Sequence, residues 1–370
     1  MQYRDYGKTG EKLSALGFGA MRLPEDDDYG IECIRRSFEL GVNYIDTASG
    51  YDTGSGASSE VVVGRALKGW RDRVKISTKN PKYRAPDGPD EWWANLEQSL
   101  ERLDTDHIDF YKVCHFLSWS DFEENVVPKG IWKAIEKARD QKLFTYTLFS
   151  SHDTPENIKR LIETELFDGM LVQYNLLDRK NEDVMELAAS KGMGVEIMGP
   201  IGGGRLGCAS QNLASVVPNV ASTPELALRF VLSNPNVSLA LSGMHSVQMV
   251  EENCATASRE EPLSDQEREQ VVAALDENRR LSELYCTGCN YCMPCPQSVG
   301  IPQAFSAMNM HRVWGLTELA REHYARLGPD NREGLLQADA CIECGICEDK
   351  CPQNIPIIEQ LRETHETLGE

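Results

Sequence analysis

The sequence predicts an α/β protein, with a (β/α)8 TIM barrel followed by a small α-helical domain. Eight short β-rich runs recur between residues 14 and 256, and an amphipathic stretch with helical spacing follows each of them. Eight consecutive strand–helix units favour a closed barrel over an open sheet. Eight of the twelve cysteines lie in two groups after residue 285, and this concentration predicts the second domain.

The predicted strands are rich in β-branched and aromatic residues. They are, in order, LGFGAM, VNYIDTAS, RVKISTK, IDFYKVC, FTYTLFS, GMLVQY, GVEIMGP and VSLALSGM. Helical patterns lie between them at 31–40, 58–68, 89–103, 129–140, 154–164, 180–191, 222–232 and 246–257. Two of these helices begin with a short oxygen acceptor followed by proline, as Thr154-Pro155 and Thr223-Pro224, which is typical of a capped first turn.

The remaining segments complete the predicted architecture. The opening residues YRDYGKTGEKLSA predict a hairpin across the bottom of the barrel. Between the cysteine groups, residues 302–338 have a helical pattern that breaks at Gly315 and Gly328. We therefore expect the barrel at 1–260, a linking helix at 261–284 and the cysteine-rich domain at 285–370.

The charge balance restricts the partners. The chain has 38 basic and 58 acidic residues, a net charge of −20 at pH 7, so nucleic acid is excluded as a partner and a basic protein is favoured. The N-terminus lacks the apolar core of a signal peptide, and no apolar run could span a bilayer. We therefore expect a cytoplasmic protein with no membrane insertion, in which clustered cysteines are metal ligands rather than disulfides.

Four polar residues fall where predicted barrel strands end, which is where barrel enzymes place their chemistry. Asp46 ends the second strand and Tyr51 follows in its loop, while Lys79 and His115 end the third and fourth strands. A tyrosine gives up its proton more readily beside an ammonium group, which a carboxylate can hold in place. A histidine can orient the substrate oxygen, although His115 is also compatible with a core histidine.

Six further segments keep the same order and position as in a known family: NYIDTASGY, SSEVVVGRALK, VKISTK, SLERLDTDHIDFYKVCH, VQYNLLDR and GPIGGGRL. With the four strand-end residues, they resemble the aldo-keto reductase family over roughly residues 1–260. The resemblance implies hydride transfer between NADP(H) or NAD(H) and a small aldehyde, ketone or alcohol, with Tyr51 as general acid/base. The strand–GxGxxG–helix unit of Rossmann folds is not present.

The resemblance also implies a set of cofactor contacts around the strand ends. Ser150, Ser151 and Gln173 correspond to residues that hold the carboxamide, although the family pair is Ser-Asn and Ser151 departs from it. Met198 stands where many relatives have an aromatic residue, and a thioether can pack on a nicotinamide face. The implied contacts are Ala20, Met21, Asp46, Ser150, Ser151, Gln173, Met198, Gly199, Pro200, Ile201, Gly203, Ser242, Gly243, His245, Gln248 and Asn253.

The adenosine end follows the eighth strand and has an unusual charge. Relatives that prefer NADPH carry lysine and arginine there for the 2′-phosphate, but residues 241–257 contain neither, and Glu251 and Glu252 are acidic. A dianionic phosphate without a cationic clamp binds weakly. We expect relaxed NADH/NADPH use or weak NADPH binding. His152 and His245 are further loop candidates for contact with substrate or cofactor.

The second cysteine group has the C-x2-C-x2-C-x3-C-P spacing of bacterial 4Fe-4S ferredoxins, in which the fourth cysteine of each run serves the other cluster. That crossing assigns Cys286, Cys289, Cys292 and Cys351 to one cluster, and Cys341, Cys344, Cys347 and Cys295 to the other. The first run is one residue short before Cys295, so a single cluster stays open, and zinc held by four thiolates is the other alternative. The helical spacer resembles α-helical ferredoxin domains.

Two functions follow. The first is an NAD(P)H-dependent reductase whose clusters have a structural, sensing or electron-transfer role. The second is an electron-transfer or redox-sensing protein whose barrel binds nucleotide without turnover, and which delivers electrons to a partner protein. Aromatic residues in the loops after the third and fourth strands are candidates for a pocket wall: Tyr83, Trp92, Trp93, Phe116, Trp119 and Phe122.

Overall fold

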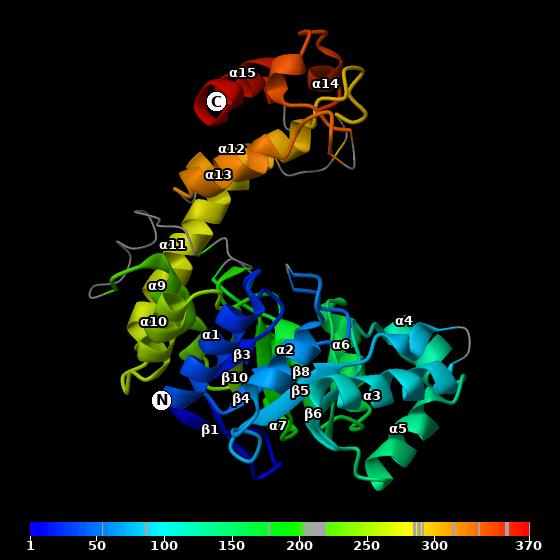
Figure 1. Ribbon diagram of the computed structural model, residues 1–370. Coiled ribbons are helices and arrows are strands. Elements are labelled where there is room, and N and C mark those ends of the chain that lie inside the picture. The colour runs from blue at the N-terminus through cyan, green and yellow to red at the C-terminus, as the bar shows by residue number, and fades with distance from the viewer. Residues whose placement is uncertain are drawn as a thin grey trace. The chain divides into compact units, whose positions relative to one another are not determined.

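Eight parallel strands close into a barrel in the computed structural model (Figure 1), which confirms the predicted fold class. Neighbouring strands follow the order β10-β3-β4-β5-β6-β7-β8-β9, with β10 paired to β3 to complete the ring. The structure describes residues 1–53, 55–85, 88–176, 178–202, 206, 220–283, 286, 290, 292–312, 315–331, 334–351 and 355–369.

Each predicted strand run contains one barrel strand. The strands are β3 (Leu16–Gly19), β4 (Tyr44–Asp46), β5 (Lys75–Lys79), β6 (Ile108–Cys114), β7 (Phe144–Ser150), β8 (Gly169–Gln173), β9 (Gly194–Met198) and β10 (Leu239–Ser242). Their inward residues form a buried cluster that includes Phe110, Leu148 and Leu239. Because the strands are parallel, all of their carboxyl ends lie at one end of the barrel.

Helices follow the strands at the predicted places. They are α1 (Asp27–Glu39), α2 (Ser59–Ala66), α3 (Pro89–Leu103), α5 (Ile131–Asp140), α6 (Pro155–Glu163), α7 (Glu182–Ser190), α9 (Thr223–Leu232) and α10 (Val247–Ala257). Short turns lie in the loops, namely η1 (Lys82–Arg84), α4 (Trp119–Asp121) and η2 (Phe122–Val126). Helix α6 shows how the local sequence specifies a helix. Thr154 caps its start by accepting a hydrogen bond from the Asn157 amide, and Ile158, Leu161 and Ile162 form its buried face.

The predicted N-terminal hairpin forms from β1 (Tyr3–Asp5) and β2 (Lys12–Ser14). It carries Tyr6 into the barrel core, where the ring is fully buried. The ring lies against Gly169 and Gly194, the first residues of β8 and β9, and a Cβ on either glycine would collide with it. The absence of a side chain at Gly169 and at Gly194 therefore leaves room for the Tyr6 ring.

The cysteine-rich part is helical, as predicted. Its helices are α11 (Asp265–Glu283), α12 (Ile301–Arg312), α13 (Thr317–Ala325), α14 (Ile346–Asp349) and α15 (Ile357–Leu368), with the short turn η4 (Ala338–Ala340). Gly315 adopts a positive φ between α12 and α13, at one of the predicted breaks. Phe305, Met308, Tyr324 and Leu361 belong to the separate hydrophobic core of this part.

The chain divides into two compact units, Met1–Gly203 with Ala227–Ser264, and Gly204–Leu226 with Asp265–Glu370. Helix α11 belongs to the second unit in this division. No helix among the described residues is both long enough and apolar enough to cross a membrane.

Candidate active site

Asp46 and Lys79 form a buried ion pair at the carboxyl ends of β4 and β5. Lys79 Nζ contacts Asp46 Oδ2 and also donates to the Thr47 carbonyl at 2.7 Å. Burial alone would raise the pKa of Asp46, but the ammonium groups of Lys112 and Lys79 outweigh it and lower that pKa below its ordinary value. The pair is therefore ionised, with a fixed positive charge at the mouth of the barrel.

Tyr51 lies directly over this charge. Lys79 Nζ is 4.7 Å from the centroid of the Tyr51 ring, which places the ammonium over the ring face. Burial lowers the pKa of Lys79, yet Asp46 and Tyr51 together raise it above its ordinary value. The ammonium thus stays charged beside the phenol.

His115 completes the group, and a β-bulge puts it there. The register between β6 and β7 shifts between Lys112 and Cys114, so β6 carries one extra residue. Tyr111 packs on Trp92 of α3, outside the barrel, and simple alternation would point His115 the same way. The bulge re-aims it, and its ring lies 6.1 Å from that of Tyr51 at an interplanar angle of 80°.

His115 is neutral in this environment. Burial is the largest cause of its pKa falling to about 3, and the charge of Lys79 adds to the effect. A neutral imidazole can accept or donate one hydrogen bond to a substrate oxygen. The structure thus brings all four predicted residues, Asp46, Tyr51, Lys79 and His115, to one end of the barrel.

Two charged residues of the barrel interior were missed from the sequence. Lys112 of β6 and Glu196 of β9 are both fully buried. Lys112 Nζ lies 2.8 Å from Asp46 Oδ1 and 2.8 Å from Glu196 Oε2. A signal existed, because each is a lone charge within an apolar strand run, FYKVC and GVEIM, at the position that alternation turns inward.

The residues expected to hold the carboxamide end neighbouring strands, but their hydroxyl groups are engaged. Ser150 Oγ accepts from the Phe116 amide at 3.0 Å. Ser151 Oγ donates to the Leu117 carbonyl at 2.7 Å and accepts from the Asp153 amide at 3.2 Å. The Ser151 hydroxyl therefore makes two bonds within the chain, one of which uses its only proton.

Gln173 and Met198 face each other in register at the ends of β8 and β9. The Gln173 amide donates to Asp178 at 3.3 Å, which leaves other polar positions of this half-buried side chain for a ligand. Gly199 has a positive φ, and its carbonyl accepts from Asn175 at 2.9 Å. Pro200 and Ile201 follow it, and Gly203 lies outside the described residues.

The remaining predicted contacts surround the ends of β3 and β10. Ala20 is buried and Met21 is exposed in the loop after β3. Ser242 accepts from Asn253 of α10 at 3.2 Å. Gly243 is exposed beside Arg22, a cation that the sequence analysis did not single out. Gly243 lies in the segment that connects β10 to α10.

Side chains near the start of α10 have partners within the chain. Gln248 donates to Glu252 at 2.8 Å. Glu251 forms an ion pair at 2.8 Å with Arg36 of α1. His245 is exposed in the loop before α10. Arg36 is thus a cation near this helix that a carboxylate already neutralises.

Half of the predicted aromatic pocket wall is core, while Trp93 and Trp119 are half-buried. Tyr83 and Trp92 are almost fully buried, and Phe122 is 6% exposed. Phe116 differs, because it is 46% exposed, has a positive φ and stacks on the His115 ring at 3.8 Å. Its other neighbour is His152, with ring centroids 4.9 Å apart. The exposed Phe116 ring therefore lies between half-buried His115 and exposed His152.

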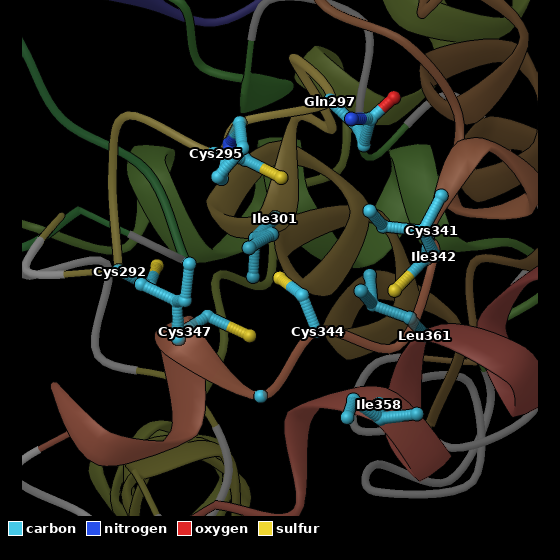
Figure 2. A pocket seen from close by; sticks show the side chains of 13 residues that line it. Cys292, Cys295, Gln297, Ile301, Cys341, Ile342, Cys344, Cys347, Ile358 and Leu361 are labelled. Atoms are coloured by element: carbon cyan, nitrogen blue, oxygen red, sulfur yellow. The ribbon is translucent and has the colours of Figure 1, made fainter.

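A second candidate site is a pocket between cysteines of both groups in the helical unit (Figure 2). Figure 2 shows the sulfur atoms of these side chains gathered around one space. The lining cysteines are Cys292, Cys295, Cys341, Cys344 and Cys347. Ile301, Ile358 and Leu361 are among its apolar lining residues. None of the cysteines that the structure describes is in a disulfide.

The donor set of this pocket suits an iron–sulfur cluster, because cubane clusters are held by cysteine thiolates. Among the described residues, no group of three histidine, cysteine or acidic side chains is arranged to hold a single metal ion. Cys286 and Cys351 pack on the core of the same unit without lining the pocket, and Cys289 lies outside the described residues.

Comparisons with known proteins agree with this layout. Residues 15–276 match the Aldo/keto reductase family, and residues 285–355 match the 4Fe-4S dicluster domain. The chain is 25% identical to uncharacterized oxidoreductase YqkF of Bacillus subtilis over 292 residues, 70% of this chain and 92% of that protein. It is 28% identical to L-galactose dehydrogenase of Arabidopsis thaliana over 315 residues, 74% of this chain and 94% of that protein.

Among solved structures, the chain is similar to aldo-keto reductase AKR11C1 from Bacillus halodurans in its holo form. The TM-score is 0.64 at 28% sequence identity, and the match covers 74% of this chain and 96% of that chain.

Proposed function

This chain belongs to the aldo-keto reductase family of oxidoreductases and carries a 4Fe-4S domain, and on that premise we propose that it is an NAD(P)H-dependent carbonyl reductase. The substrate is a small aldehyde or ketone, or the corresponding alcohol in the reverse direction. The observation that carries the proposal is the Asp46–Lys79 pair beneath the Tyr51 ring, with His115 next to it.

The chain's own groups supply the proton chemistry. Tyr51 donates its phenolic proton to the carbonyl oxygen of the substrate, and Lys79 stabilises the negative charge that develops on the phenol oxygen. Asp46 keeps Lys79 charged and in position. Neutral His115 orients the carbonyl oxygen by a hydrogen bond. The nicotinamide, when bound, supplies the hydride.

The cofactor preference follows from charge. The carboxylate of Glu251 neutralises Arg36, and residues 241–257 contain no lysine or arginine. We infer relaxed use of NADH and NADPH or weak NADPH binding, with Arg22 beside Gly243 as a cation that could contact a phosphate. A measured preference for NADPH above about a hundredfold, on the order of 2.7 kcal/mol, would contradict this inference.

The test is reduction of a panel of small aldehydes and ketones by NADH and NADPH, after anaerobic purification. Tyr51→Phe should lower kcat by about a thousandfold, since positioned acid catalysis contributes about 10²–10⁴. Tyr83→Phe is the matched control, because that phenol is buried and bonds to the Phe116 carbonyl at 3.0 Å. Normal nucleotide binding without turnover of any carbonyl would favour a nucleotide-binding redox sensor instead.

For the helical unit we propose two cubane clusters with crossed ligands. Support comes from Cys295 of the first group lining one pocket with Cys341, Cys344 and Cys347 of the second. Two clusters predict about eight iron atoms per chain, one cluster about four. Zinc without iron, measured on anaerobically purified protein, would support the four-thiolate zinc alternative.

A further inference from the structure

A second buried ion pair lies inside the barrel, behind Asp46. Lys112 and Glu196 are fully buried and their charged atoms are 2.8 Å apart. Glu196 Oε1 accepts from Tyr6 at 2.8 Å and from Tyr44 at 2.5 Å. Two phenols and one ammonium therefore hold this carboxylate at the centre of the barrel.

The buried charges alternate in sign along a continuous chain. Lys79 contacts one oxygen of Asp46, and Lys112 contacts the other at 2.8 Å. Glu196 follows on the far side of Lys112. The Asp46–Lys79 pair is already neutral, so the second pair is not needed to balance it. Burying an extra ion pair is costly in water-excluded surroundings, which suggests a role beyond packing.

The added ammonium contributes its own potential beside that of Lys79. Asp46 contacts both ammonium groups, and the potentials of separate charges add. Lys112 lies between Asp46 and Glu196, so its positive charge is on the side nearer to Tyr51. The pair therefore adds a positive potential toward the phenol.

We propose that Lys112, anchored by Glu196, is a positioning residue that fixes Asp46 and maintains the positive potential at the Tyr51 phenol. The inference rests on the proposed role of Tyr51 as general acid. The charged and titratable groups that face Lys112 come from the N-terminal hairpin and from β4, β5 and β9, and they are Tyr6, Tyr44, Asp46, Lys79 and Glu196.

The charge of Lys112 also acts on His115. The pKa of His115 is lowered mainly by burial, and the charge of Lys112 acts in the same direction as that of Lys79. Lys112 also donates to Ser77 Oγ at 2.6 Å, and Ser77 in turn bonds to Asp46 at 3.1 Å. These bonds fix the direction of its charge.

The experiment replaces the whole pair, by Lys112→Met with Glu196→Gln, so that no lone charge is left in the barrel. With a carbonyl that the wild type reduces, kcat should fall at least about tenfold while KM stays within about twofold. The tyrosinate absorbance that depends on Tyr51, taken as the difference from a Tyr51→Phe partner, should appear about one pH unit higher. A purely structural role would not move that onset.

The matched control changes Asp109 of the same strand together with its partner Arg71. Arg71→Met with Asp109→Asn removes a partly buried ion pair of 2.9 Å at the amino end of β6. It should lower stability without moving the tyrosinate onset or kcat. A kcat and an onset equal to those of the wild type in the double variant would overturn the inference while leaving the proposed function intact.

Misfolding of the double variant and failure of the proposed function can each be distinguished from failure of this inference. If the double variant does not fold, Glu196→Gln alone keeps Lys112 and removes its negative partner, so the onset should move to lower pH. No shift there overturns the inference. If the wild type reduces no carbonyl, the proposed function fails, and the tyrosinate onset in the same variants still decides the inference.

Discussion

In the barrel, the charged side chains Asp46, Lys79 and Lys112 are each less than 5% exposed, and oppositely charged groups of the same chain hold them. In the helical unit, Cys344 is exposed, and Cys295 and Cys341 are half-buried around a pocket lined by isoleucine and leucine. In the barrel site, the charges are balanced by residues on its own strands. In the helical unit, thiol groups surround a pocket, and a bound cluster would link them.

The difference teaches where each site obtains its geometry. Barrel strands impose a register, so the side chains of Asp46 and Lys79 meet because their strands end side by side. The described cysteines of the pocket lie in turns and in the short helix α14, where no strand register fixes them; the Cys341 sulfur, for example, accepts from the Glu343 amide at 3.4 Å. The barrel site should then be insensitive to changes at the thiols.

The largest expected effect is a difference in kcat between substitutions at the two ends of one barrel strand. Lys79→Met should lower kcat by about a hundredfold or more, because the charge that stabilises the Tyr51 oxygen is lost. Lys75→Met, at the other end of β5 and paired with Glu11 at 2.9 Å, should leave kcat within about twofold. Equal losses of kcat in both variants, measured by steady-state kinetics, would mean that disruption of the strand lowers activity, and not the loss of the charge beside Tyr51.

The next prediction tests the independence of the two units directly. Cys344→Ser should remove about half of the iron if two clusters are present, since it deletes a ligand of one of them. Reduction of a carbonyl by NAD(P)H should stay within about twofold of the wild type, because hydride transfer needs no one-electron carrier. Iron analysis and kinetics on the same anaerobic sample give both numbers.

The control is Cys254→Ser, which changes a buried thiol of α10 that lines no cluster pocket. It should keep the full iron content. A loss of carbonyl reduction in Cys344→Ser, with Cys254→Ser active, would contradict the independence of the two units and connect the clusters to the barrel reaction.

The sequence predicts the barrel well because the signals repeat. Eight apolar strand runs alternate with helical spacing, and Asp46, Lys79 and His115 stand where those runs end. Two features escape it. The bulge that re-aims His115 depends on pairing between β6 and β7, which no local pattern shows. Likewise, the contact between Lys112 and Glu196 joins residues 84 positions apart, and only barrel closure brings them together.

The cofactor contacts are the least predictable part, since they lie in loops. Ser151 matches a family position, yet its hydroxyl bonds to the Leu117 carbonyl and the Asp153 amide. Arg36, which pairs with α10, comes from a helix far away in the chain and is neutralised by Glu251. Such long-range pairing has no periodic signal.

A third prediction concerns stability and contrasts glycines in the two units. Gly194→Ala should destabilise the barrel by about 1–3 kcal/mol, because the added methyl group would overlap the buried Tyr6 ring. Gly328→Ala, in the helical unit, adds a methyl group to open space and should change stability little. Thermal unfolding followed by circular dichroism measures both, and equal stabilities would show that the Tyr6 contact is not tight.

The smallest effect is a pH dependence that belongs to the barrel alone. Burial lowers the pKa of His115 from 6.5 to about 3, so below pH 6.5 the unfolded chain takes up a proton that the folded chain refuses. The free energy of unfolding must therefore fall as the pH decreases through this window. His115→Gln removes the penalty, and its free energy of unfolding should rise by about 1–2 kcal/mol relative to the wild type between pH 6.5 and 5.

The control is His107→Gln. The His107 ring bonds to the Lys142 carbonyl at 2.6 Å and to Thr145 at 2.8 Å. Melting temperatures of the three proteins across this range give the comparison, and parallel curves for wild type and His115→Gln would mean that His115 is protonated in the folded barrel.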